Sequence, residues 1–262
     1  MKRSLIVTVM LSAAMVYGQA ANPGLLAWLG TQAAGWSAPT NPVAYWAMTN
    51  PVQDDTTGNY AGVPYGNAKL TNGVDDTTNS AWYFDGVHDG INIVDNNVFS
   101  FGNGSTDSAF SYSFWIYVQS YPAEWGSMVS KWTNYREYGI WMNNNGRFIF
   151  ILADNSKGDN ANSHLYTSNT IPLKTWTHIV ATYDGTGGAT CLTGANLYIN
   201  GVYAPSSYNY AAQAYVAMEN TTSVLTLGSN GYWDLNCALS RIRLYARELT
   251  QAEAATLSEE FD

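Results

Sequence analysis

The chain has 262 residues, of which 46% are hydrophobic, enough to close a substantial core in one large domain or two small ones. Only 12% of the residues are charged whereas 14% are aromatic, a composition that excludes disorder driven by charge. The 11 basic and 20 acidic side chains give a net charge of −9, which repels nucleic acid, so we expect no nucleic-acid partner. A surface rich in aromatic residues and poor in charge suits neutral polar ligands such as sugars, or contact with copies of the same chain.

The first 20 residues have the pattern of a secretory signal peptide. Lys2 and Arg3 precede an apolar run at residues 5–16, and the small residues Gly18 and Ala20 follow at cleavage spacing. The apolar run is well short of the roughly 20 residues that cross a bilayer, which argues against a membrane anchor. We therefore expect cleavage near Ala20, no membrane insertion, and a secreted, extracellular or periplasmic protein.

The remaining sequence reads as almost entirely β. Short runs rich in Val, Ile, Tyr, Phe and Trp alternate with clusters of Asn, Asp and Gly, and no helical period is sustained before the C-terminus. The predicted strands lie at residues 44–48, 81–84, 90–93, 110–118, 127–131, 139–142, 148–152, 176–183, 196–199, 225–228 and 238–245. Even spacing and the lack of a linker favour one two-sheet sandwich over residues 41–262, after a lead-in segment at residues 21–40.

Two tight hairpins can be predicted from turn chemistry. Asn145-Gly146 and Asn200-Gly201 are pairs that adopt positive φ easily, so the segments 139–152 and 195–204 should each fold back as an antiparallel ribbon.

A single short helix is expected at the C-terminus. Thr250 and Glu253 have the spacing of a capping box, in which each side chain satisfies a backbone amide at the start of a helix.

The two cysteines, Cys191 and Cys237, predict a disulfide because the chain is expected to be exported and the count is even. Two free buried thiols are the alternative. A zinc site is excluded, because His88, His164 and His178 are scattered and no metal-binding spacing occurs.

The order of short motifs over residues 41–258 resembles that of LamG-like domains in the concanavalin A-like lectin/glucanase superfamily. No one motif is specific, but ten occur in the expected order. They are Tyr45-Trp46, Asp55-x-x-Gly58, Tyr83-Phe84-Asp85-Gly86, Phe114-Trp115, Val129-Ser130-Lys131, Trp176-Thr177-His178-Ile179-Val180, Tyr183-Asp184-Gly185, Leu197-Tyr198-Ile199-Asn200-Gly201, Leu227-Gly228 and Ile242-Arg243-Leu244-Tyr245. The resemblance implies a jelly roll of two antiparallel sheets, which agrees with the all-β prediction made from the strands and the short C-terminal helix.

Three tryptophans in predicted strands are expected to lie in the core. Trp46, Trp115 and Trp176 stand among apolar neighbours, and burying such large rings would stabilise a sandwich that has few charges. His178 lies inside a strand and is expected to be a buried imidazole rather than a catalytic group.

Catalysis is not expected, although the superfamily includes glucanases. Glycoside hydrolysis normally needs two carboxylates about 5 to 9.5 Å apart across the scissile bond. The glucanase relatives carry E-x-D-x-E or E-x-D-x-x-E, and none of the seven Glu residues of this chain begins such a pattern.

Calcium is a candidate cofactor that would stabilise the fold. Asp54, Asp55 and Asn59 place carboxylate and amide oxygens in one loop, and such oxygens are the ligands that calcium prefers. The resemblance also implies calcium at this loop, with a second acidic contribution just before the last strand. This chain has Ser240 and Arg241 there, so one expected carboxylate is replaced.

Aromatic residues in predicted loops are the better candidates for ligand contact, because a ring that completes the core cannot also face a ligand. The loop aromatics are Trp125, Trp132, Tyr135, Tyr208, Tyr210, Tyr215, Tyr232 and Trp233. Sugar rings stack on such side chains while neighbouring polar groups bind the hydroxyls. The predicted ligand-binding residues are Trp132, Tyr135, Arg136, Tyr232 and Trp233.

Two functions remain open from the sequence. The first is a secreted, non-catalytic, lectin-like protein that binds carbohydrate through these loop aromatics. The alternative is an extracellular structural or adhesion protein that recognises another protein or assembles with itself, since Trp, Tyr and Arg are also enriched at protein interfaces.

Overall fold

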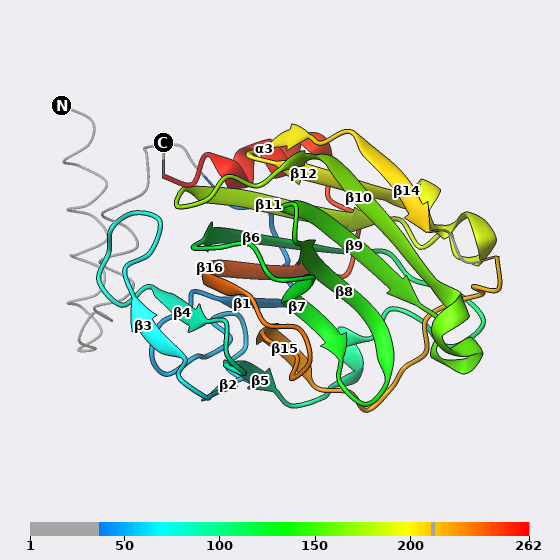
Figure 1. The fold of residues 1–262 in the computed structure, drawn as a ribbon, viewed down its shortest axis with the longest axis horizontal. Coiled ribbons are helices and arrows are strands. Elements are labelled where there is room, and N and C mark those ends of the chain that lie inside the picture. The colour runs from blue at the N-terminus through cyan, green and yellow to red at the C-terminus, as the bar shows by residue number, and fades with distance from the viewer. Residues whose placement is uncertain (1–36, 211–212, 262) are drawn as a thin grey trace, which may run out of the picture.

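The computed structural model describes residues 37–210 and 213–261 and shows two antiparallel β-sheets, I and II, of eight strands each. Figure 1 looks down the shortest axis of the molecule, and one sheet lies in front of the other in this view. The predicted signal peptide and most of the lead-in segment lie outside the described residues, so both stay predictions.

Sheet I has the strand order β13-β12-β11-β6-β16-β4-β3, and β1 also pairs with β16. Its strands are β1 (Ala44–Trp46), β3 (Lys69–Thr71), β4 (Ala81–Asp85), β6 (Phe110–Val118), β11 (Trp176–Tyr183), β12 (Ala195–Ile199), β13 (Val202–Tyr203) and β16 (Asn236–Tyr245).

Sheet II has the order β14-β10-β9-β8-β7-β15-β5-β2. Its strands are β2 (Gly62–Tyr65), β5 (Gly90–Ile93), β7 (Trp125–Trp132), β8 (Arg136–Asn143), β9 (Arg147–Ala153), β10 (Asn162–Thr170), β14 (Ser206–Tyr210) and β15 (Leu225–Gly228). Short 3₁₀ helices lie at η1 (Asn97–Phe99), η2 (Asn155–Ala161) and η3 (Gly188–Gly194).

All eleven predicted strands are present, and both predicted hairpins are confirmed. Gly146 lies between β8 and β9 with φ of 73°, and Asn200 and Gly201 join β12 to β13 with φ of 48° and 72°. Gly201 also lets a helix approach closely, because a Cβ there would lie 2.7 Å from the Cα of Ala255.

That helix is α3 (Gln251–Ser258), and its capping box is confirmed. The Thr250 hydroxyl accepts a hydrogen bond from the Glu253 amide at 3.2 Å, and the Glu253 carboxylate accepts one from the Thr250 amide at 2.9 Å. The helix packs on the outer face of sheet I, where Leu249, Ala254 and Leu257 are fully buried.

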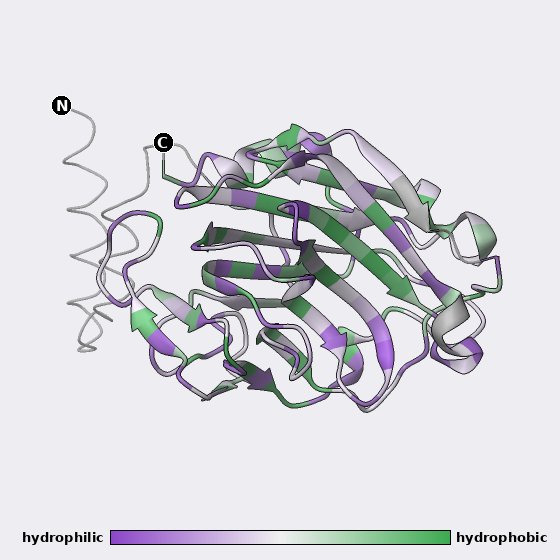
Figure 2. Ribbon diagram, viewed as in Figure 1, coloured by the Kyte–Doolittle hydropathy of each residue, from purple (hydrophilic) through white to green (hydrophobic). Residues whose placement is uncertain are grey.

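The core lies between the inner faces of the two sheets, and Figure 2 shows the hydrophobic residues gathered along the strands. Trp46 is fully buried there and donates its indole hydrogen bond to the Tyr60 carbonyl at 2.7 Å, as expected for a core tryptophan.

Trp115 is buried, as expected, but both Trp115 and Trp176 lie outside the core between the sheets, in which the prediction placed them. Phe114 and Ile116 take the inward positions of β6, so the alternation of a strand turns Trp115 outward. Trp115 packs instead against His178 and Phe261 on the outer face, and Trp176 is half-buried beside Tyr117. His178 is fully buried, as expected.

The predicted disulfide is also wrong, because Cys191 and Cys237 lie at opposite ends of β6. Cys237 pairs with Val118 at one end of that strand, whereas Tyr183 pairs with Phe110 at the other. Cys191 lies in η3, whose flanking strands meet at that second end. Eight strand steps separate the ends by about 26 Å, and a disulfide tolerates no more than about 7 Å between Cα atoms.

Both cysteines should therefore behave as protected free thiols. Each is buried, and burial raises the pKa of Cys191 to about 11 and that of Cys237 further still. We expect a thiol reagent to leave the native protein unlabelled and to label two groups per chain after denaturation without reductant. Labelling that needs prior reduction would contradict this geometry.

In the part of the chain that the structure describes, no helix is long and apolar enough to span a bilayer.

Candidate functional site

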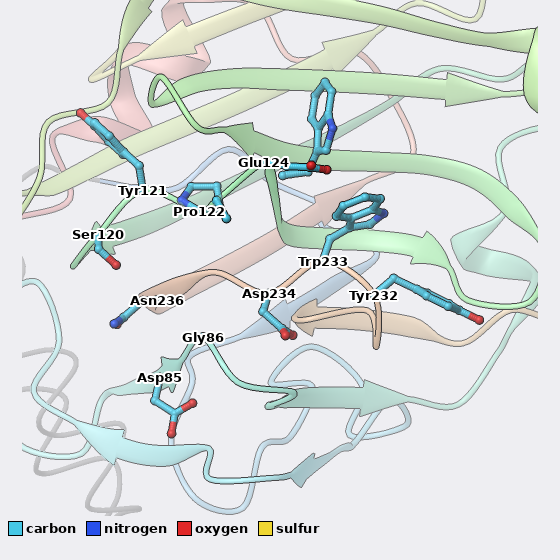
Figure 3. Close-up of a pocket in the computed structure, with 12 residues that line it drawn as sticks. Asp85, Gly86, Ser120, Tyr121, Pro122, Glu124, Tyr232, Trp233, Asp234 and Asn236 are labelled. Atoms are coloured by element: carbon cyan, nitrogen blue, oxygen red, sulfur yellow. The ribbon is translucent and has the colours of Figure 1, made fainter.

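A groove of about 480 Å³ at one end of the sandwich is the candidate site, and we call it the end groove. Three connections line it: the one after β4, the one between β6 and β7, and the one between β15 and β16. Figure 3 shows Tyr121, Pro122 and Glu124 on one side, with Asp85, Asp234 and Asn236 on the other. The lining residues are Asp85, Gly86, Ser120, Tyr121, Pro122, Ala123, Glu124, Trp125, Tyr232, Trp233, Asp234 and Asn236.

The connection that presents Trp233 is held by its own turn. The Asn230 side-chain oxygen accepts hydrogen bonds from the amides of Tyr232 and Trp233 at 3.1 and 3.0 Å. Gly231, between Asn230 and Tyr232, has φ of 85°, a value that favours glycine. The Trp233 carbonyl then accepts from the Ser127 amide at 3.1 Å, which fixes the loop to β7.

The opposite connection is anchored in a similar way. The Tyr121 hydroxyl donates to the Ile171 carbonyl at 2.8 Å, and the Gln119 amide donates to the Asn236 carbonyl at 2.9 Å. The two walls of the groove are thus fixed to each other through the backbone. A site held in this way needs little reorganisation to bind a ligand.

The polar part of the groove consists of carboxylates and an amide. Asp85 accepts from the Asn67 side chain at 3.1 Å, and Asp234 accepts from the Ser229 hydroxyl and lies 3.5 Å from the His88 ring. Glu124 is exposed at the rim. These groups accept hydrogen bonds and carry negative charge, so the groove can bind hydroxyl groups and disfavours anionic ligands.

The aromatic part is continuous with a cluster on the outer face of sheet II. Trp141 lies at its centre, with ring centroids 6.1 Å from Trp233, 6.3 Å from Trp125 and 5.0 Å from Trp132. Trp125 and Trp233 are half-buried, so each retains an accessible part of its ring. They are the two indoles that line the groove.

The structure places only some of the predicted ligand-binding residues in the end groove. Tyr232 and Trp233 line the end groove, and Tyr232 is 66% exposed. Trp132 is the last residue of β7 and only 9% exposed, beneath the Arg136 guanidinium at 5.5 Å from its ring centroid. Tyr135 is 48% exposed in the β7–β8 turn and does not line the groove.

Several lining residues were not predicted from the sequence. Asp85 was noted only as part of the motif Tyr83-Phe84-Asp85-Gly86, and Tyr121 and Glu124 were not selected at all. The sequence of the β6–β7 connection, Ser120-Tyr121-Pro122-Ala123-Glu124-Trp125, does combine aromatic and acidic residues before a strand, which is the signal that could have found them.

In the loop predicted to bind calcium, both carboxylate oxygens of Asp54 already accept hydrogen bonds. The two oxygens of Asp54 accept hydrogen bonds from the amides and hydroxyls of Thr56 and Thr57 and from the Tyr45 amide, at 2.5–3.2 Å. Burial acts to raise the pKa of Asp54, but these hydrogen bonds outweigh it and lower the pKa below the usual value. A calcium ion would have to displace bonds that the loop makes with itself.

The other predicted ligands do not complete a calcium site. Asp55 accepts from the Ala47 amide at 3.0 Å, and its pKa is raised, mainly by burial, although the nearby Arg241 opposes this. Asn59 is exposed. Over residues 37–210 and 213–261, no group of three or more His, Cys, Asp and Glu side chains could hold a metal ion. These residues do not fit calcium well. Calcium binding itself is untested, and this geometry leads us to expect no stabilisation by the ion.

We expect EDTA to leave the melting temperature of the protein unchanged, and added calcium to leave it unchanged as well. An ion that binds the native state alone would raise the melting temperature with the logarithm of its excess. If calcium raised the melting temperature and Asp54→Asn abolished that rise, calcium would bind at this loop after all.

Two carboxylates, the buried Glu137 and the partly exposed Asp95, do meet elsewhere, but around a buried lysine. Lys131 Nζ lies 2.6 Å from Glu137 and 2.9 Å from Asp95, and both Lys131 and Glu137 are fully buried. Burial raises the pKa of Glu137, which the Lys131 charge opposes. This group is a buried ion pair and offers no open space for a scissile bond between the carboxylates.

Similar solved structures are binding domains. The binding domain of Paraclostridial Mosquitocidal Protein 1 shares 18% identity at a TM-score of 0.64, over 83% of this chain and 52% of that chain. A structure of botulinum neurotoxin type C shares 15% identity at a TM-score of 0.63, over 84% of this chain and 51% of that chain. Domain 4 of AbnA, an extracellular arabinanase from Geobacillus stearothermophilus, shares 19% identity at a TM-score of 0.60, over 83% of this chain and 98% of that chain.

These likenesses show the jelly-roll fold, and the chain spans about half the length of the two toxin chains. A comparison with curated protein sequences gives no match. The family model described as "Concanavalin A-like lectin/glucanases superfamily" matches residues 85–255, most of the described sandwich. The motif order, the two antiparallel sheets and this match agree, and the chain belongs to the concanavalin A-like lectin/glucanase superfamily.

Proposed function

We propose that the protein is an exported, non-catalytic carbohydrate-binding protein that holds a neutral sugar in the end groove. The observation that carries the proposal is the pairing of two half-buried indoles, Trp125 and Trp233, with carboxylate and amide acceptors in one preformed groove. Sugar rings present apolar faces to aromatic side chains and hydroxyl groups to such acceptors.

The similar structures support a carbohydrate ligand. The AbnA domain was solved in complex with arabinotriose, and cell entry of botulinum neurotoxin type C depends on interaction with two ganglioside molecules. The net charge of −9, together with Asp85, Glu124 and Asp234 in the groove, opposes acidic ligands. The ligand proposed here is therefore a neutral saccharide.

A role in recognising protein is the second candidate. The binding domain of botulinum neurotoxin DC, about half of which matches this chain, was solved in complex with rat synaptotagmin II, so a chain that contains this fold can also hold a protein partner. Tyr232, 66% exposed at the rim of the groove, would serve either kind of ligand.

The experiment is a binding screen of the purified protein against neutral polysaccharides, including arabinan, xylan and cellulose, followed by titration calorimetry with oligosaccharides of each polymer that binds. Trp233→Ala should weaken binding by on the order of tenfold to a hundredfold, by analogy with aromatic stacking on nucleobases. Tyr203→Ala is the matched control, since Tyr203 is an exposed tyrosine on β13 that does not line the groove. Binding to none of the polymers, or equal loss in both variants, would contradict the proposed site.

A further inference from the structure

A second hollow of about 360 Å³ lies on the outer face of sheet I, next to the end groove. Tyr83, Tyr117, Trp176 and Ala238 line it, and we call these four residues the aromatic strip. Thr71, Asn72 and Gln119 line the same hollow and supply hydroxyl and amide groups.

The strand register explains why the strip is continuous. Trp176 pairs with Tyr117, Tyr117 pairs with Ala238, and Ala238 pairs with Tyr83, so the four residues form one row across β11, β6, β16 and β4. Residues paired in this way lie on the same face of a sheet, and three strand spacings extend over about 14 Å. Ala238 has the smallest side chain of the row, which leaves the hollow between the two tyrosines.

These rings are not required by the core. The core lies on the inner face of sheet I, whereas Tyr83, Tyr117 and Trp176 point outward and are half-buried. Cross-strand packing accounts for part of their presence, because the Trp176 and Tyr117 ring centroids are 5.7 Å apart. It does not account for a polar-rimmed hollow between aromatic side chains.

The strip adjoins the end groove directly. Asp85 and Asn236 line the groove, and each lies two residues along its strand from a strip residue, Tyr83 and Ala238 respectively. A separation of two residues keeps side chains on the same face of a strand. The Tyr83 hydroxyl also donates a hydrogen bond to the Asn236 side chain at 2.9 Å, so the two hollows share a wall.

We propose that the aromatic strip is a second subsite, and that the ligand is a neutral oligosaccharide chain running from the end groove onto the outer face of sheet I. This inference rests on the proposed function and specifies its ligand as several linked sugar rings rather than one terminal sugar. The rings of Tyr117 and Trp176 stack on sugars, and the side-chain amides of Asn72 and Gln119 bind their hydroxyls. The Tyr83 ring, which has the Lys69 ammonium 5.3 Å from its centroid, borders the hollow.

The test compares ligand length in wild type and variants. Linear arabino-, xylo- and cello-oligosaccharides of increasing length are titrated by calorimetry into wild type, Trp176→Ala, Trp233→Ala and Tyr203→Ala. Tyr203 is the matched control, because it is an exposed tyrosine on β13 of the same sheet outside both hollows. Ala238→Phe is a second strip variant that fills the hollow without removing a ring, and circular dichroism checks that each variant is folded.

We expect the affinity of wild type to rise with chain length in the series that binds. Trp176→Ala and Ala238→Phe should weaken the longer ligands at least about fivefold and leave the shortest unchanged, whereas Trp233→Ala should weaken all of them. If the affinity of the strip variants rises with oligosaccharide length as it does in wild type, the aromatic strip is not a subsite. The proposal for the end groove is then unaffected. If wild type binds no saccharide in any series, both the proposed function and this inference fail.

Discussion

Replacing Glu137 with alanine should lower the free energy of unfolding by about 3–5 kcal/mol, because it leaves a buried lysine without its main partner. Lys131 Nζ donates to Glu137 at 2.6 Å and to the Thr221 carbonyl at 2.8 Å, and Glu137 also accepts from the Thr221 amide and hydroxyl at 2.8 and 2.7 Å. The cluster joins β7 and β8 to the segment before β15. Urea denaturation measures the loss.

Two further variants separate charge from packing in this cluster. Glu137→Gln keeps an acceptor for Thr221 but removes the charge, so it should cost less than Glu137→Ala yet still destabilise the fold. The double variant Lys131→Met with Glu137→Leu removes both charges together, and it should recover much of the loss. A cost of less than about 1 kcal/mol for Glu137→Ala would show that Asp95 alone can neutralise Lys131.

Trp46→Ala should also cost about 3–5 kcal/mol in the free energy of unfolding, because it opens a cavity in the core and removes a donor from the Tyr60 carbonyl. Trp233→Ala should cost about 1 kcal/mol or less, since that ring is half-buried in the end groove and contributes little to the core. Urea denaturation of the two variants, with saccharide titration of each, makes the comparison. Similar stability losses in both would mean that Trp233 is a structural residue rather than a binding residue.

Local rules predicted the parts of the fold that depend on neighbouring residues. The Asn-Gly pairs fix the two hairpins through backbone conformations that few other residues adopt easily, and the Thr250 to Glu253 capping box needs only four residues. β10 was missed because its sequence, Asn-Ser-His-Leu-Tyr-Thr-Ser-Asn-Thr, is mostly polar. It is a strand because β9 and β14 pair with it on both sides, which no local pattern reveals.

The tryptophans show why alternation alone is insufficient. Alternation indicates which residues of a strand share a face, but not which face is inside. In β6 both faces are largely buried, since the C-terminal segment covers part of the outer one, so the hydrophobic pattern does not identify the inward positions. Trp115 and Trp176 were assigned to the wrong face for this reason.

The candidate site could be predicted only in part. Tyr232 and Trp233 were found because a ring in a polar loop has no evident role in the core. Asp85 and Glu124 come from connections more than 100 residues away in sequence from that loop, and the strand order of the sheets brings them together. The same long-range order places Cys191 and Cys237 at opposite ends of β6, which their even count could not show.

The most direct test of the end groove is the NMR spectrum of the tryptophan indole N–H groups during titration with a saccharide that binds. The indole resonances of Trp125 and Trp233, assigned by single substitution, should shift in a saturable way with the same affinity that calorimetry gives. That of Trp46, whose indole is buried and bonded to the Tyr60 carbonyl, should not move. Saturable binding that leaves both groove resonances in place, and shifts others instead, would contradict a carbohydrate site in the end groove.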